Sequence, residues 1–142
     1  MQRAYVREEL DASIEAAWDC LRDFADISTW AQGRVVTTEG TGVGMIRHVD
    51  TSNGRAVERC EAHDDQAHTF SYRLLESPWP FRNYVATVRL TTAGPHRCVI
   101  EWSSTFETDV PEGSMRTQVE QAYRDRFIAK LRDTLRQRQA GI

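Results

Sequence analysis

The stretch PEGSMRTQVEQAYRDRFIAKLRDTLRQRQ, residues 111–139, predicts the fold of this chain more directly than any other. Its apolar residues recur at steps of three and four, as on one face of an α-helix; they are Met115, Val119, Ala122, Tyr123, Phe127, Leu131 and Leu135. Asp109 and Glu112 have the spacing of an N-cap and the third helical residue, and Pro111 suits a first turn. Such a helix is about 40 Å long at ~1.5 Å per residue, so its apolar face needs a broad partner.

The partner predicted for this helix is a β-sheet, because β-forming residues and turn signals alternate along most of the preceding chain. The expected strands are residues 4–10, 33–39, 45–50, 55–62, 67–75, 83–91 and 97–107. Two short helices are expected after the first strand, one starting at Ile14 with Asp11 or Ser13 as its cap, and one over residues 26–30. Short connections require antiparallel strands. The sequence therefore predicts one α+β domain, residues 1–142, with a seven-stranded antiparallel sheet around a C-terminal helix.

Residues at alternate positions of each predicted strand point to opposite faces of the sheet, which we call the parity of the residue. The face expected to meet the helix mixes large aromatic rings with small residues. Its members on the last three strands are Phe70, Tyr72, Leu74, Tyr84, Ala86, Val88, Leu90, Ile100, Trp102, Ser104 and Phe106. Large rings beside Ala86 and Ser104 leave gaps, and such a gap between sheet and helix is a place for a small ligand. The alternative is a core whose gaps are closed by neighbouring side chains.

Composition and charge argue against several classes of function. The formal net charge is -3, without a basic stripe, so nucleic acid is not an expected partner. The apolar runs are too short for a membrane span, and the N-terminus lacks the apolar segment of a signal peptide. Cys20, Cys60 and Cys98 are an odd number without CxxC spacing, which predicts a reducing cytoplasm and neither a disulfide nor a zinc site. No cofactor is expected, and the oligomeric state, monomer or homodimer, is left open.

Several short motifs in a fixed order resemble the polyketide cyclase/dehydrase group of the START and birch-pollen-allergen-like superfamily, also called SRPBCC. They are Gly42-Val-Gly-Met-Ile-Arg47, Glu58-Arg59, Asp64-Asp65, Phe70-Ser-Tyr72, Asn83-Tyr84 and Asp109-Val-Pro-Glu-Gly113, together with Trp18, Leu21, Asp23-Phe24 and Trp30 near the start. The resemblance covers almost the whole chain. It implies the helix-grip fold, in which a curved seven-stranded antiparallel sheet surrounds a C-terminal helix.

The resemblance extends to plant abscisic-acid receptors, in which the pocket positions are known. It implies that the cavity is lined by Arg47, Val49, Ala56, Glu58, Tyr72, Leu74, Phe81, Tyr84, Ala86, Ser104, Val119, Tyr123 and Phe127. The receptors' anchoring lysine aligns with Ala31, and their latch is replaced by Trp79-Pro80-Phe81. A hormone-receptor role is therefore not implied. Trp30 is expected as an apolar plug, Trp102 as a core ring or a stacking surface for a flat ligand, and Trp79 as a surface plug or a lid.

Arg47 and Glu58 are the strongest candidates for chemistry, because they lie on successive strands of one hairpin and parity directs both inward. A buried charge needs a partner, so one interpretation is a salt bridge that shapes the pocket. The other is catalytic, with Glu58 accepting a proton and Arg47 stabilising an enolate. Tyr72 and Tyr84 are either hydrogen-bond donors to a ligand or ordinary core residues. The histidines around Asp64-Asp65 are interpreted as a solvated turn rather than a metal site.

Three functions remain open. The first is binding of a small hydrophobic or aromatic, lipid- or polyketide-like molecule in the cavity. The second is a polyketide cyclase or dehydrase that uses Glu58 with Arg47. The third is a protein-interaction or chaperone-like domain with a filled core, which predicts no enclosed cavity of about 300 Å³ or more.

Overall fold

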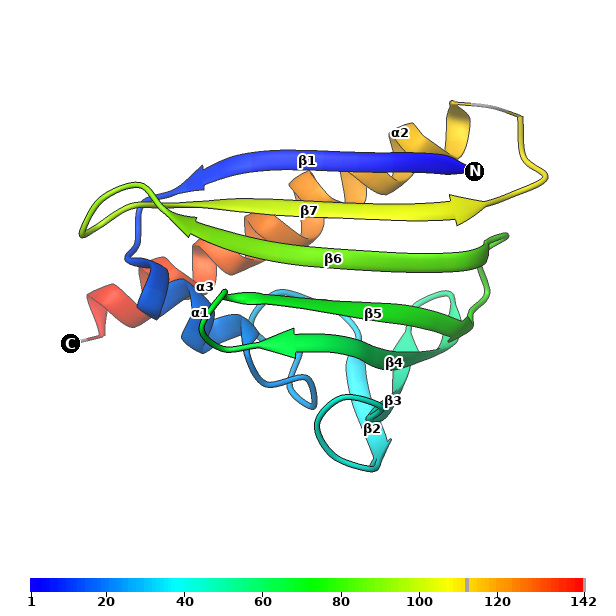
Figure 1. Ribbon diagram of the computed structural model, residues 1–142, viewed down its shortest axis with the longest axis horizontal. Helices are drawn as coiled ribbons and strands as arrows, with labels where there is room; N and C mark the ends of the chain where they lie inside the picture. Colours follow the sequence, from blue (N-terminus) through cyan, green and yellow to red (C-terminus); the bar gives the residue numbers. More distant parts are fainter. Residues whose placement is uncertain (112, 142) are drawn as a thin grey trace.

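The seven predicted strands form one antiparallel sheet in the computed structural model, which describes residues 1–111 and 113–141. The strands are β1 (Gln2–Leu10), β2 (Arg34–Glu39), β3 (Ile46–Thr51), β4 (Gly54–Asp64), β5 (Thr69–Glu76), β6 (Arg82–Thr92) and β7 (Cys98–Glu107). Their order is β1-β7-β6-β5-β4-β3-β2, so the first strand pairs with the last (Figure 1). The antiparallel arrangement expected from the short turns is confirmed.

The C-terminal helix crosses one face of this sheet at an angle to the strands (Figure 1). It consists of α2 (Ser114–Ala122), a π-helical segment η1 (Tyr123–Ile128) and α3 (Ala129–Ala140). The helix begins later than predicted, because Gly113 is its N-cap with a φ of 89°, a left-handed conformation that glycine adopts readily. The capping role predicted for Asp109 is therefore wrong, and Glu112 lies outside the described residues.

The π-helical segment changes which side chains face the sheet. The buried residues of the helix are Met115, Val119, Tyr123, Ile128, Leu131 and Leu135. The step from Tyr123 to Ile128 is five residues, because a π-helical turn contains one residue more than an α-helical turn of this size. Ile128 therefore enters the core, where the sequence pattern had predicted Phe127, and Phe127 is half-buried beside it.

One of the two short helices expected after the first strand is present. It is α1 (Ile14–Leu21), and the Ser13 hydroxyl caps it by accepting a hydrogen bond from Ala16 N at 3.1 Å. The helix predicted over residues 26–30 is instead a series of turns, in which Ile27 O accepts hydrogen bonds from Trp30 N and Ala31 N. One isolated turn cannot propagate, since helix formation becomes favourable only over several turns.

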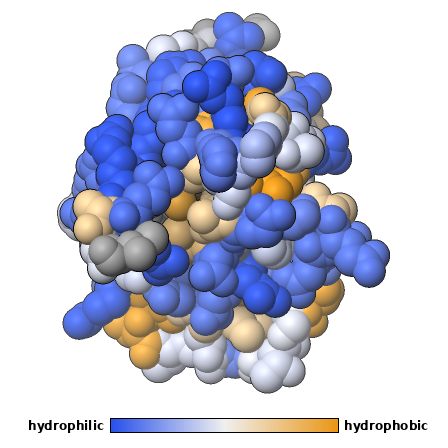
Figure 2. Space-filling model, turned by 90° about the vertical axis from the view of Figure 1, so that its left-hand side faces the viewer, coloured by the Kyte–Doolittle hydropathy of each residue, from blue (hydrophilic) through white to orange (hydrophobic). Residues whose placement is uncertain are grey.

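The core lies between the sheet and the C-terminal helix, and its composition follows the predicted parity. Val88, Leu90, Ile100, Trp102 and Phe106 are all buried on the inner face of the sheet. On the side of the molecule where the helix ends, hydrophilic residues cover most of the surface, with hydrophobic residues visible in recesses and small patches (Figure 2). No helix within the described residues is long and apolar enough to cross a membrane.

Candidate functional site

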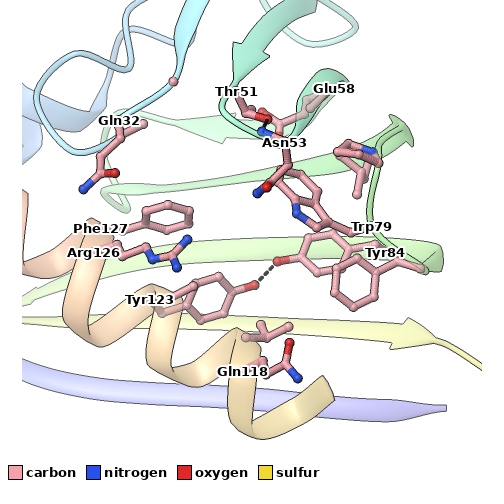
Figure 3. Close-up of a pocket in the computed structure, with 18 of the residues that line it drawn as sticks. Gln32, Thr51, Asn53, Glu58, Trp79, Tyr84, Gln118, Tyr123, Arg126 and Phe127 are labelled. Atoms are coloured by element: carbon pink, nitrogen blue, oxygen red, sulfur yellow. Dashed lines mark hydrogen bonds between the residues drawn. The ribbon is translucent and has the colours of Figure 1, made fainter. Parts of the chain in front are cut away.

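A cavity of about 970 Å³ lies between the inner face of the sheet and the C-terminal helix. Its walls come from the segment after α1, the β3–β4 and β5–β6 loops, strands β4 to β6 and the helix (Figure 3). Ser52, Asn53, Gln118 and Gln121 line it and are exposed, so the cavity opens to solvent there. Ligand cavities span roughly 300–1,000 Å³, and this volume lies within that range. The filled-core alternative concerns an enclosed cavity, so a cavity that is open to solvent leaves it untested.

Most of the residues predicted to line the cavity do so. They are Trp30, Ala56, Glu58, Tyr72, Leu74, Phe81, Tyr84, Val119, Tyr123 and Phe127. Five others are buried but do not form the cavity wall: Arg47, Val49, Ala86, Trp102 and Ser104. Trp102 is a core ring, which is one of the two roles expected for it. Curvature of the sheet decides this difference, because residues of the same parity face the same side but lie at different depths. What these residues bind remains a prediction.

Sequence reasoning missed the polar part of the wall, which includes Thr51, Ser52 and Asn53 at the β3–β4 turn. The Ser52-Asn53-Gly54 signal predicted a hairpin turn correctly, but nothing in a turn motif indicates that the turn borders a cavity. Gln118 and Gln121 on the helix also line it. Their three-residue spacing beside the apolar face is a signal that would have placed them on the flank of the helix next to the pocket.

Arg47 and Glu58 form a hydrogen-bonded ion pair. They are direct partners in the β3–β4 register, and Arg47 Nε donates to Glu58 Oε1 at 2.8 Å. Arg47 Nη1 donates to Phe24 O at 2.9 Å, and the guanidinium lies 3.9 Å from the centre of the Phe24 ring. The Arg47 side chain is only 1% exposed, whereas Glu58 is 16% exposed and forms part of the cavity wall. The pair therefore presents its carboxylate, and not its guanidinium, to the cavity.

Three buried tyrosines supply the other polar groups inside the cavity. Tyr72 lies on β5 and lines the cavity. Tyr84 projects from the sheet and Tyr123 from the helix, and their hydroxyls are hydrogen-bonded to each other (Figure 3). Burial raises the pKa of each phenol well above its ordinary value, and the nearby Glu58 charge raises these pKa values further. All three are therefore uncharged at neutral pH and offer hydroxyl groups to a ligand.

Aromatic rings form the rest of the inner wall. Trp30 packs edge-on against Phe127 with ring centres 5.1 Å apart, and Phe81 lies 5.0 Å from Tyr84. Trp79 lines the cavity from the β5–β6 loop and is half-buried (Figure 3). Rings from the sheet, the helix and a loop thus surround the same space, which suits a flat apolar molecule. The proposed motion of Trp79 as a lid remains a prediction.

The turn around Asp64-Asp65 is exposed to solvent, as predicted, and its residues also contact α1. Trp18 Nε1 donates to Asp65 Oδ1 at 2.9 Å, and the rings of His63 and His68 lie 5.5 and 5.7 Å from the Trp18 ring. His63 Nε2 hydrogen-bonds to Arg22 O. These contacts join helix and sheet. Within residues 1–111 and 113–141, no group of three or more acidic, His or Cys side chains is arranged to hold a metal ion.

Comparison with known proteins agrees with the predicted resemblance. The family model described as polyketide cyclase/dehydrase and lipid transport matches residues 1–136. An uncharacterised protein from Bacillus thuringiensis has a TM-score of 0.83 and 23% sequence identity, over 94% of this chain and 98% of that chain. Protein XoxI from Bacillus cereus has a TM-score of 0.75 and 21% identity, over 96% and 94% of the two chains.

An enzyme is also among the similar structures. Norcoclaurine synthase from Thalictrum flavum, in complex with dopamine and hydroxybenzaldehyde, has a TM-score of 0.67 and 15% identity. The match covers 94% of this chain and 83% of that chain. At these identities the likeness concerns the fold alone, and it confirms the predicted helix-grip arrangement of a curved antiparallel sheet and a long C-terminal helix.

Proposed function

Because this chain belongs to the polyketide cyclase/dehydrase and lipid transport family, we propose that it binds a small hydrophobic or aromatic molecule between its sheet and its C-terminal helix. The observation that carries this proposal is the cavity of about 970 Å³, which is lined by rings from both layers and is open to solvent. Burial of flat apolar surface against these rings supplies the affinity. The tyrosine hydroxyls and Glu58 orient the polar end of the ligand.

Native mass spectrometry of freshly purified protein tests this function first, because a tightly bound molecule stays with the chain and is identified after denaturation. A second test uses 2-naphthylmethanol as a probe and follows tryptophan fluorescence, to which Trp30 and Trp79 in the cavity wall contribute. Binding should be saturable with one site per chain. No bound molecule and no saturable fluorescence change would contradict the proposal.

A cavity-filling variant locates the site. Ala56 is buried in the cavity wall, so Ala56→Phe should weaken naphthylmethanol binding at least ~10-fold, since one ring then occupies ligand space. Ala67→Phe is the matched control, because Ala67 is exposed and is not part of the wall. Equal binding by the two variants would place the ligand elsewhere.

The second candidate function is an enzyme of the cyclase or dehydrase type. It is favoured by one observation: the Glu58 carboxylate lines the same cavity as three uncharged phenols. Glu58 would accept a proton from a carbon next to a carbonyl group, and a phenol would donate to the enolate oxygen. Arg47 is not in the cavity wall, so it would position Glu58 rather than touch substrate. Glu58→Gln separates the candidates: turnover of a poly-carbonyl substrate should vanish in an enzyme, whereas a binder should change in affinity only.

A further inference from the structure

The charges around the cavity are unevenly placed. Among the described residues of the wall, Glu58, Asp125 and Arg126 are the ionised ones. Asp125 and Arg126 are adjacent in the helix and both are exposed to solvent, so their charges are largely screened. Glu58 is mostly buried, and its charge is screened much less. The electrostatic character of the interior therefore depends mainly on this one carboxylate.

Arg47 does not reverse this character. Its guanidinium is nearly inaccessible, lies against the Phe24 ring and is held by Glu58 Oε1 and Phe24 O. A ligand in the cavity meets Glu58 first and the guanidinium only behind it. The ion pair is neutral as a whole but acts as a dipole with its negative end toward the cavity.

The tyrosines add hydrogen-bonding capacity without charge. The hydroxyls of Tyr72, Tyr84 and Tyr123 are buried, uncharged and border the cavity. One proton of the Tyr84–Tyr123 pair lies in their mutual hydrogen bond, so the other proton and that of Tyr72 are the ones that can be donated to ligand oxygens. A carbonyl, hydroxyl or ether oxygen suits them. A carboxylate would bring a second negative charge close to Glu58. The one cationic side chain of the described wall, Arg126, is exposed on the helix, so its charge is screened by solvent.

From this geometry we infer that the cavity selects by charge: it takes neutral or cationic molecules that donate a hydrogen bond to Glu58, and it excludes carboxylate-bearing ligands such as fatty acids. The inference rests on the proposed function and names its ligand class. A hydroxylated or amine-bearing aromatic molecule fits it. Tight binding of a carboxylate would require the Arg47 guanidinium to turn toward the ligand. Its Nη2 atom, which has no hydrogen-bond partner among the described residues, would then donate to the ligand carboxylate.

The test uses three ligands that share one ring system and differ in one group: 2-naphthylmethanol, 2-naphthylmethylammonium and 2-naphthoate. Dissociation constants at pH 7 are measured by isothermal titration calorimetry. The alcohol and the ammonium should each bind at least ~10-fold tighter than the carboxylate, because like charges a few ångströms apart in a partly buried site repel strongly. A carboxylate that binds as tightly as the alcohol overturns the inference, and this comparison needs no variant.

Glu58→Gln assigns the effect to the residue, because glutamine keeps the size and removes the charge. The Arg47 charge is then no longer balanced, so the carboxylate should bind at least as tightly as the alcohol, and the ammonium should lose at least ~10-fold. Glu76→Gln is the matched control, because Glu76 is an exposed carboxylate on β5 that does not line the cavity, and it should leave the order of the three affinities unchanged. An unchanged order in Glu58→Gln overturns the inference.

The two proposals fail in different ways. If all three ligands bind equally and Ala56→Phe blocks them, the cavity binds ligands but does not select by charge. If none of the three binds, the proposed function fails together with the inference.

Discussion

Replacing Arg47 by methionine should destabilise the protein strongly, although the substitution is close to isosteric. The guanidinium is 1% exposed and donates to Glu58 and to Phe24 O, so Arg47→Met leaves a carboxylate and a carbonyl without these donors. Removing one partner of a buried ion pair costs about 3–5 kcal/mol. Glu58 keeps 16% of its side chain exposed and can be partly hydrated, so we expect a value near the lower end, about 3 kcal/mol. For a domain of this size that is a decrease in Tm of roughly 10 °C.

Urea unfolding followed by circular dichroism measures this loss, together with the double variant Arg47→Met/Glu58→Gln. The double variant has no unpaired carboxylate, so it should regain about 1–2 kcal/mol relative to Arg47→Met alone. Arg55→Met is the matched control from the same hairpin. The Arg55–Asp50 pair has a similar distance of 2.7 Å, but the two side chains are 50% and 48% exposed. This control should cost less than about 1 kcal/mol.

The reasoning would be refuted if Arg47→Met and Arg55→Met were equally stable, since the two pairs differ in their burial and in the additional contacts of the Arg47 guanidinium with Phe24. Strict additivity in the double variant would also refute it. Additive effects would mean that the carboxylate does not depend on the guanidinium, and both the positioning role of Arg47 and the polarity of the cavity would lose their basis.

Three further outcomes follow from packing and protonation. Leu131→Ala should cost about 2–5 kcal/mol in urea unfolding because Leu131 is fully buried, whereas Arg124→Ala on the exposed face should stay within about 0.5 kcal/mol. Burial raises the pKa values of Tyr72, Tyr84 and Tyr123, so the unfolded chain loses these protons at lower pH than the folded chain does. The free energy of unfolding should therefore be constant below pH about 10 and decrease above it, by up to about 1.4 kcal/mol per pH unit for each tyrosine. Tyr72→Phe should make this decrease shallower when unfolding is measured from pH 9 to 11. Gly33→Ala should lower Tm, since a Cβ there would lie 2.9 Å from Asp50 O; an unchanged Tm would show that the strand end shifts freely.

The order of elements and the two faces of each strand could be predicted from the sequence, because both are local properties of the chain. Alternation along β5, β6 and β7 correctly assigned Phe70, Val88 and Trp102 to the inner face, since adjacent side chains of a strand must point to opposite sides. The pairing of Arg47 with Glu58 also followed from one tight hairpin, whose turn sets the register. The resemblance to the family rested on such short segments as well.

Three features were decided only by the tertiary structure: how far each inward-facing residue lies from the cavity, which residues of the helix enter the core, and which polar residues line the cavity. The alternation along a strand does not distinguish between inward-facing residues. Tyr72 and Tyr84 form the cavity wall, whereas Trp102 and Ser104 are buried behind it. The twist and curvature of the sheet set how close each inward-facing residue comes to the cavity. The π-helical turn buries Ile128 in the core while Phe127 lines the cavity, and the period of 3.6 residues on which the prediction rested contains no such turn. Whether a charge faces the ligand or lies behind its partner is likewise a fact of three-dimensional packing.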